Sequence, residues 1–158
     1  MNKQANIQCT IEDGDEKSSE YVKQQMLEYN SKFTQPVGPS KNVPVHLVLK
    51  AEDGTIMGGL SATIFYLRAR CYIDRLWIHE SLRGLDYGTK LMNAIEEKVK
   101  LENCNIILVD TFSFQAPRFY EKLGYQVYGK LDDYPSVGLS SFYYQKRLDK
   151  PSTFPSPA

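Results

Sequence analysis

One stretch of the sequence is well suited to bind an anion: Arg83-Gly-Leu-Asp-Tyr-Gly-Thr-Lys90. Two glycines let the chain turn so that several backbone N–H groups point into one space. A helical pattern begins there, and a helix N-terminus adds partial positive charge to the full charge of Arg83. The stretch therefore predicts a pyrophosphate-binding loop. A plain strand-to-helix connection with two turn glycines fits the same spacing.

The spacing and the composition exclude several other classes of protein. The stretch has neither the GxxxxGK[ST] spacing of a P-loop nor the GxGxxG spacing of a dinucleotide fold. Lys and Arg number 19, and so do Asp and Glu, which argues against a general nucleic-acid binder. No apolar run approaches the ~20 residues that span a bilayer, and the N-terminus has no apolar signal-peptide core.

Hydrophobic periodicity predicts the elements that position the loop. Tyr87, Leu91, Ile95 and Val99 step by four, as on one face of an amphipathic helix. An earlier helix follows the acids Asp13, Asp15 and Glu16 and carries Val22, Met26, Tyr29 and Phe33 on one face, and a short third helix covers 115–122. Strands are expected at 7–11, 45–49, 56–65, 71–78, 106–109, 125–129 and 141–146, with an Asp-Gly hairpin turn at 52–55.

The order of these elements predicts the fold class. The order β-α-β-β-β-α-β-α-β-β is typical of a mixed α/β or α+β sheet with helices on its faces. Residues 45–78 form a three-stranded antiparallel meander, and strands 71–78 and 106–110 are parallel because a crossover helix joins them. We expect one domain over residues 1–150 and a mobile tail over residues 151–158.

Two motifs resemble the GNAT superfamily of acyl-CoA-dependent N-acetyltransferases. The first is similar to [Q/R]-x-x-G-x-[G/A], with Arg83 and Gly88 in register and Asp86 at the place of the middle glycine. Asp86 adds negative charge there and is expected to remove the freedom of positive φ. The second motif is similar to N-x-x-A-x-x-[L/F]-Y-x-x-x-G-[F/Y]. The residues in register with it are Ala116, Phe119, Tyr120, Gly124 and Tyr125. Ser113 stands at the Asn position, where its hydroxyl can cap the short helix.

The resemblance implies a GNAT-like, mostly antiparallel sheet of about seven strands, with helices on both faces, that splays between its fourth and fifth strands. The pantetheine of acetyl-CoA enters this splay and pairs with backbone groups of the fourth strand. The N–H of Ile78 polarises the thioester carbonyl. The residues expected to bind the coenzyme are Leu76, Trp77, Ile78, Arg83, Gly84, Leu85, Asp86, Tyr87, Gly88, Thr89, Ser113, Phe119 and Lys122.

The resemblance also implies a proton donor and a proton acceptor. Tyr120 is expected to donate to the departing CoA thiolate, because a phenol with a pKa near ~10 is protonated at neutral pH. Packing on a short helix is the structural alternative for this aromatic residue. Asp74, on the same strand face as Tyr72, is the candidate base, and a solvent-facing strand carboxylate is its alternative. No cysteine lies at a motif position, so we expect direct attack by the amine.

The predicted function is therefore acetyl transfer from acetyl-CoA to a primary amine. A small cationic metabolite is the expected acceptor, and Asp13, Asp15, Asp132 and Asp133 can attract it. The alternatives are a CoA-binding regulatory domain without catalysis and a lysine acetyltransferase that acts on proteins. We expect no nucleic-acid or membrane partner, and a homodimer is possible.

The cysteines and histidines bear on the compartment and on metal binding. Cys9, Cys71 and Cys104 are odd in number and far apart, and no CxxC or Cys/His cluster occurs. This pattern predicts neither a disulfide framework nor a zinc site. We expect no metal and a reducing, cytoplasmic location.

Overall fold

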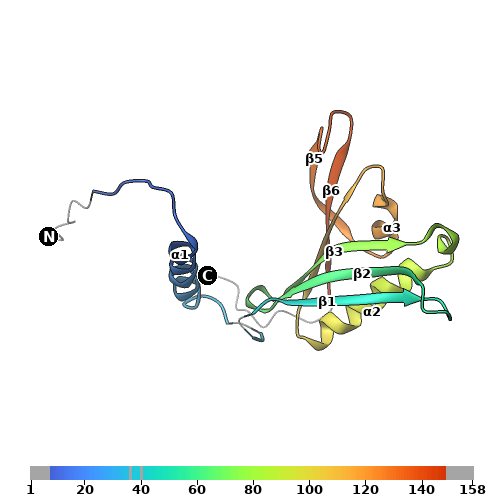
Figure 1. Ribbon diagram of the computed structural model, residues 1–158, viewed down its shortest axis with the longest axis horizontal. Helices are drawn as coiled ribbons and strands as arrows, with labels where there is room; N and C mark the ends of the chain where they lie inside the picture. Colours follow the sequence, from blue (N-terminus) through green and yellow to red (C-terminus); the bar gives the residue numbers. More distant parts are fainter. Residues whose placement is uncertain (1–7, 36, 40, 149–158) are drawn as a thin grey trace. The chain divides into compact units, whose positions relative to one another are not determined.

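The computed structural model describes residues 8–35, 37–39 and 41–148 (Figure 1). The chain divides into two compact units, one up to Gln35 and one from Pro36. The prediction of one domain over residues 1–150 stays a prediction. The expected mobile tail, 151–158, lies outside the described residues.

The first unit contains helix α1 (Glu16–Asn30), which confirms the first predicted helix. A capping box begins it: Asp15 Oδ1 accepts from the N–H of Ser18 at 2.9 Å, and Ser18 Oγ accepts from the N–H of Asp15 at 2.8 Å. The strand expected at 7–11 is wrong, because residues 8–11 form no regular structure. Ile7 and Ile11 are its only apolar residues besides Cys9, too few to hold a short strand on a neighbour.

In the described part of the second unit, six strands form one mixed sheet in the order β1-β2-β3-β4-β6-β5. All neighbours are antiparallel except β3 and β4, which are parallel as predicted. The sheet therefore has six strands rather than about seven. The strands are β1 (Val43–Lys50), β2 (Ile56–Phe65), β3 (Arg70–Ile78), β4 (Ile106–Phe112), β5 (Gln126–Asp132) and β6 (Ser140–Arg147).

Helices α2 (Tyr87–Leu101) and α3 (Pro117–Lys122) complete the unit, with 3-10 turns at Tyr66–Arg68 and Glu80–Leu82. Five residues that are cross-strand partners form one row of buried or half-buried side chains: Val45, Ala62, Ile73, Val109 and Tyr144. We call this side of the sheet the core face. Both helices pack here, because one hydrophobic cluster contains their buried side chains, Leu91, Met92, Ile95, Val99 and Tyr120. The opposite side is the outer face, and helices over it stay a prediction.

The sheet splits between β3 and β4. The two strands pair from Arg70–Ile106 to Ile73–Val109 and no further. Beyond that point β3 continues to pair with β2 as far as Ile78, and β4 continues to pair with β6 as far as Phe112. Figure 1 shows β3 running across the view while β6 rises away from it. This divergence confirms the predicted splay.

A β-bulge lies where the split begins. Ser61 is opposite Arg75 and Ala62 is opposite Ile73, so Asp74 is the extra residue on β3. A bulge increases the local twist of a strand. The bulge at Asp74 therefore helps β3 to turn away from β4 immediately after their last paired residues.

Candidate active site

One wall of the split is a strand edge with free backbone groups. The N–H of His79 donates to the carbonyl of Met57 at 2.8 Å, so it points toward β2. Because successive residues of a strand point to opposite sides, the backbone groups of Leu76 and Ile78 face the split and those of Trp77 face β2. The Ile78 carbonyl accepts from Arg83 Nε at 3.2 Å. The Ile78 N–H is open toward the split, because β4 does not pair with β3 at this point.

The loop before α2 leads into a helix whose first backbone N–H groups have no side-chain cap. Gly84 and Asp86 both have left-handed backbones, with φ of 77° and 60°. The expectation that Asp86 removes positive φ is wrong, because aspartate is among the residues that tolerate this conformation. The first helical bond runs from the Lys90 N–H to the Asp86 carbonyl at 3.0 Å, and the Asp86 side chain caps nothing. The first N–H groups of α2 are therefore free to bind an anion; they belong to Tyr87, Gly88 and Thr89.

Helices α2 and α3 meet beside this loop. A Cβ atom on Gly88 would lie 3.1 Å from the Phe119 ring, so this glycine permits the close approach. Phe119 therefore packs beside the free N–H groups of α2. Lys122 is three residues further along α3 and is exposed, on the same side of the helix as Phe119. Arg83 and Leu85 are also exposed, so a ligand can reach both side chains from solvent.

Tyr120 projects from α3 into the core face. Its ring lies 5.9 Å from the rings of Tyr125 and Tyr144, and the residue is 6 % exposed. Within the described residues its hydroxyl has no hydrogen-bond partner. Burial, and secondly the charge of Asp110, raise the pKa of Tyr120 to about 12. The phenol is therefore protonated at neutral pH and has a free hydrogen to donate.

Two carboxylates lie on the outer face where the split begins. Asp74, the candidate base, accepts from the Thr63 hydroxyl at 2.9 Å through Oδ2 and is exposed. Asp110 is half-buried on β4 and accepts from the Tyr72 hydroxyl. Burial and this hydrogen bond raise the pKa of Tyr72. Sequence reasoning missed Asp110, although a charged residue directly after the apolar run of 106–109 was a signal.

Ser113 holds the loop between β4 and α3 against β6. Its Oγ accepts from the Ser140 N–H at 3.2 Å, and its N–H donates to the Ser140 carbonyl at 2.8 Å. Its expected role as a helix cap is wrong: Ala116 occupies the N-cap, with no side-chain bond, because this strand-like pairing fixes Ser113 before the helix begins.

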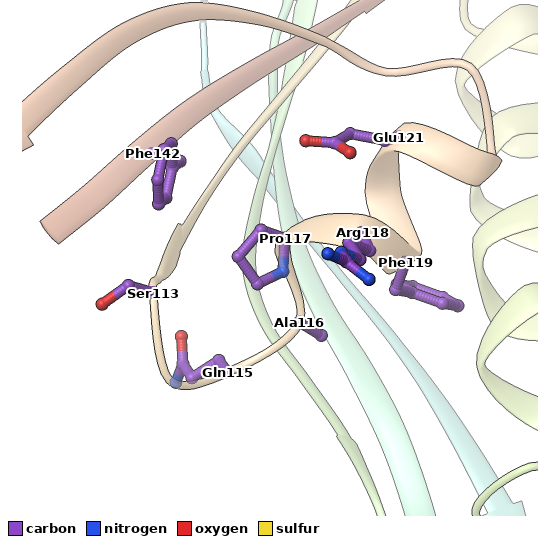
Figure 2. Close-up of a pocket in the computed structure, with 8 residues that line it drawn as sticks. All are labelled: Ser113, Gln115, Ala116, Pro117, Arg118, Phe119, Glu121 and Phe142. Atoms are coloured by element: carbon purple, nitrogen blue, oxygen red, sulfur yellow. The ribbon is translucent and has the colours of Figure 1, made fainter.

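A pocket of about 500 Å³ lies next to this loop. Figure 2 shows Phe142 of β6 on one side and Pro117 and Glu121 of α3 on the other. Ser113 and Phe119, two predicted coenzyme-binding residues, belong to its lining. The structure thus brings both residues to one cavity beside α3.

Three of the four acids that were expected to attract an amine, Asp15, Asp132 and Asp133, have local partners. Asp132 pairs with Lys130 at 2.6 Å and accepts from Ser140 Oγ at 3.0 Å. Asp133 accepts from the N–H of Gly138 at 2.9 Å. These contacts stabilise the hairpin of β5 and β6. Asp15 caps α1, as described above, and Asp13 precedes that helix.

The described residues contain neither a cluster of metal-binding side chains nor a membrane-spanning helix. In 8–35, 37–39 and 41–148, no group of three or more His, Cys, Asp or Glu side chains is placed to hold a metal ion. Within the same ranges, no helix is both long enough and apolar enough to cross a membrane. Cys9, Cys71 and Cys104 are free thiols.

Comparison with known proteins identifies the family. The model of the acetyltransferase (GNAT) family matches residues 10–125. Blasticidin-S acetyltransferase of Streptomyces morookaense is 33 % identical over 98 residues, which cover 61 % of this chain and 70 % of that protein. A crystal structure of an acetyltransferase from Bacillus cereus ATCC 14579 is 39 % identical, with a TM-score of 0.74, covering 89 % of this chain and 98 % of that one.

A more distant solved structure shares the fold. It is an aminoglycoside 6'-N-acetyltransferase complexed with coenzyme A, 18 % identical with a TM-score of 0.61, and the match covers 87 % of this chain and 83 % of that one. The split sheet and the family match agree with one another. This chain belongs to the GNAT family of acetyltransferases.

Proposed function

We propose that this protein transfers the acetyl group of acetyl-CoA to a primary amine, which attacks the thioester directly in a ternary complex. The observation that carries this proposal is the split between β3 and β4, which has the free N–H of Ile78 on one wall. There the sheet offers an unpaired strand edge. A thioester placed in the split is open to attack from the outer face.

The residues of the chain fit an extended coenzyme. The backbone groups of Leu76 and Ile78 can pair with the amides of pantetheine, as one strand pairs with the next. The free N–H groups at the start of α2 and the exposed Arg83 suit the pyrophosphate. The aminoglycoside acetyltransferase that shares this fold was crystallised with coenzyme A.

The reaction needs a donor for the developing oxyanion and a proton for sulfur. The Ile78 N–H donates to the carbonyl oxygen, and one such oriented donor contributes about 3 kcal/mol. The Tyr120 hydroxyl donates its hydrogen to the departing sulfur. Its pKa, raised to about 12, keeps this hydrogen in place throughout the neutral range.

Burial of the two cysteines in the second unit favours direct attack by the amine over a covalent acyl-enzyme. Cys71 and Cys104 are buried, and burial raises the pKa of their thiols to about 12 and about 11. A buried, protonated thiol is a poor nucleophile. The amine itself is therefore the group that attacks the thioester.

The acceptor that we propose is a small cationic metabolite. The Streptomyces relative is named for the acetylation of blasticidin S. In the described part of the chain, Asp74 and Asp110 have no ion-pair partner, so their charge is available to an ammonium group. Acetylation of protein lysines and coenzyme binding without catalysis remain the alternatives. The cytoplasmic location and the homodimer stay predictions.

Two measurements on the purified chain test this function. Isothermal titration measures binding of acetyl-CoA and of CoA, and a thiol-release assay follows turnover with blasticidin S, an aminoglycoside, a polyamine and a lysine peptide. We expect binding of both coenzymes and release with at least one small amine. Binding without release with any acceptor favours the regulatory alternative, and release with the peptide alone favours the protein acetyltransferase. Absence of binding contradicts the proposal.

A further inference from the structure

The proton donor and the nearest half-buried carboxylate lie on opposite faces of the sheet. Tyr120 packs against Tyr144 on the core face. Asp110 is opposite Tyr143 on β6 and follows the core-face residue Val109, so its side chain points to the outer face. An intact sheet separates groups on its two faces. The split between β3 and β4 is the place where both can reach the same atoms.

Asp110 lies at the start of this split. Val109 is the last residue of β4 that pairs with β3, and Asp110 is the next. The Tyr72 hydroxyl, which comes from β3, donates to Asp110 Oδ1 and so spans the two strands at the point where they separate. Oδ2 of Asp110 has no hydrogen-bond partner among the described residues and is available to a ligand.

Asp74 is less well directed for proton transfer. Its Oδ2 accepts from Thr63, which belongs to β2, the strand on the far side of β3 from the split. Asp74 is exposed, whereas Asp110 is half-buried. Asp110 is also the charged group that contributes, after burial, to the raised pKa of Tyr120. The charge of Asp110 therefore acts on the Tyr120 hydroxyl, the group that donates a proton to sulfur.

We propose that Asp110 is the catalytic base that accepts the proton of the acceptor ammonium, and that Tyr72 is the positioning residue that orients its carboxylate. This inference rests on the proposed acetyl transfer. The ammonium gives one proton to Asp110, and the neutral nitrogen forms a bond to the thioester carbon. The carbon–sulfur bond then breaks, the sulfur takes the hydrogen of Tyr120, and the second nitrogen proton restores the phenol. Asp110 releases its proton to water, so the products are the amide, CoA thiol and one proton.

The titratable groups around Asp110 come from four elements. Tyr72 and Asp74 lie on β3, Tyr143 lies on β6, Tyr128 lies on β5 and Tyr120 lies on α3. Burial raises the pKa of Tyr72 and of Tyr120, so both of these phenols are neutral at the pH of the reaction. Asp74 is the one other carboxylate of this set, so the role of Asp110 must be tested with variants of both aspartates.

Asn substitutions compare the two aspartates directly. The full chain is assayed with whichever of blasticidin S and an aminoglycoside the wild-type protein acetylates. Asp110→Asn keeps the shape and an acceptor for Tyr72, and we expect kcat/KM to fall at least 100-fold with an unchanged Kd for acetyl-CoA. The loss should shrink as the pH rises, because more of the amine is then already neutral. Asp53→Asn, in the turn between β1 and β2, is the control and should retain full activity.

The variant Tyr72→Phe tests the positioning role. It removes a hydrogen-bond donor that favours the ionised carboxylate. We expect the acidic limb of the kcat/KM profile to move to higher pH, with activity recovered at the plateau. A merely structural tyrosine would lower activity equally at every pH.

The outcomes separate the two proposals. If the wild-type chain releases no thiol with any amine, the proposed function fails and this inference fails with it. If the wild type is active and Asp110→Asn retains its activity, Asp110 is not the base and the function stands. A loss in Asp74→Asn that exceeds the loss in Asp110→Asn returns the role to Asp74. Circular dichroism confirms that each variant is folded.

Discussion

Gly88 and Phe119 approach one another so closely that a Cβ atom on residue 88 would lie 3.1 Å from the ring. This contact joins the first turn of α2 to α3. It therefore couples the position of the free N–H groups at the start of α2 to the helix that carries Tyr120. Because of this closeness, a side chain at position 88 requires the Phe119 ring to shift.

Gly88→Val should weaken acetyl-CoA binding about tenfold, or about 1.4 kcal/mol. The branched side chain must push Phe119, and with it α3, away from the first turn of α2. Isothermal titration measures the change. Gly129→Ala on β5 is the matched control, because its Cβ would make ordinary contacts of 3.7 Å with Tyr143. Equal effects of the two substitutions would show that the Gly88 contact does not shape the coenzyme site.

Tyr120→Phe should keep the fold and the affinity for acetyl-CoA but lower turnover at least tenfold, equivalent to about 1.4 kcal/mol of activation free energy. The Tyr120 hydroxyl has no hydrogen-bond partner among the described residues, so its removal orphans no other group. Steady-state thiol release measures the loss. Tyr144→Phe removes a hydroxyl that donates to Glu121 at 2.9 Å and should leave turnover within about twofold. Unchanged turnover in Tyr120→Phe would remove this residue from the mechanism.

Lys146→Met should destabilise the fold by about 3 kcal/mol. Lys146 Nζ contacts both carboxylate oxygens of Glu96 at 2.9 Å, and the Glu96 side chain is only 8 % exposed. The substitution leaves a buried, unpaired charge. Denaturant unfolding measures the free energy, and adding Glu96→Gln should recover most of it, because the amide oxygen still accepts from Tyr125.

The control for this ion pair is the exposed pair of Lys23 and Glu20 on α1. Lys23→Met should change the free energy of unfolding by less than about 0.5 kcal/mol, because water screens exposed charges. A similar cost for Lys23→Met and Lys146→Met would contradict the importance of burial.

The stability of the protein should decrease as the pH rises above about 10. The pKa of Tyr120 and that of Tyr144 are raised to about 12, whereas phenols of the unfolded chain ionise near ~10. Between these values the folded state binds more protons than the unfolded state, so rising pH favours unfolding. Urea midpoints from pH 8 to pH 12, followed together with phenolate absorbance, measure the effect. Constant midpoints with tyrosines ionising in the folded state would contradict it.

The helices and strands with the clearest hydrophobic periodicity were predicted most accurately from the sequence. The helix with Leu91, Ile95 and Val99 on one face is α2, and the expected strand 56–65 matches β2 residue for residue. Local residue pattern determines both. The strand at 7–11 failed because a strand forms only where a neighbour pairs with it, and pairing is not a local property.

The site was predicted as a set of residues but not as a geometry. The motifs placed Arg83, Gly88 and Tyr120 near one loop and one helix, and the structure brings these elements together. The left-handed backbone of Asp86 and the hydrogen bond of Ser113 to Ser140 depend on tertiary contacts. The contact between Tyr72 and Asp110 could not be foreseen, because the two residues are 38 positions apart in the sequence and meet only through the register of β3 and β4.

A crystal structure of the chain with acetyl-CoA is the decisive experiment. We expect the pantetheine to lie in the split between β3 and β4, with the thioester oxygen within hydrogen-bonding distance of the Ile78 N–H and the sulfur beside the Tyr120 hydroxyl. Acetyl-CoA bound elsewhere, with the split closed or empty, would overturn the proposed mechanism.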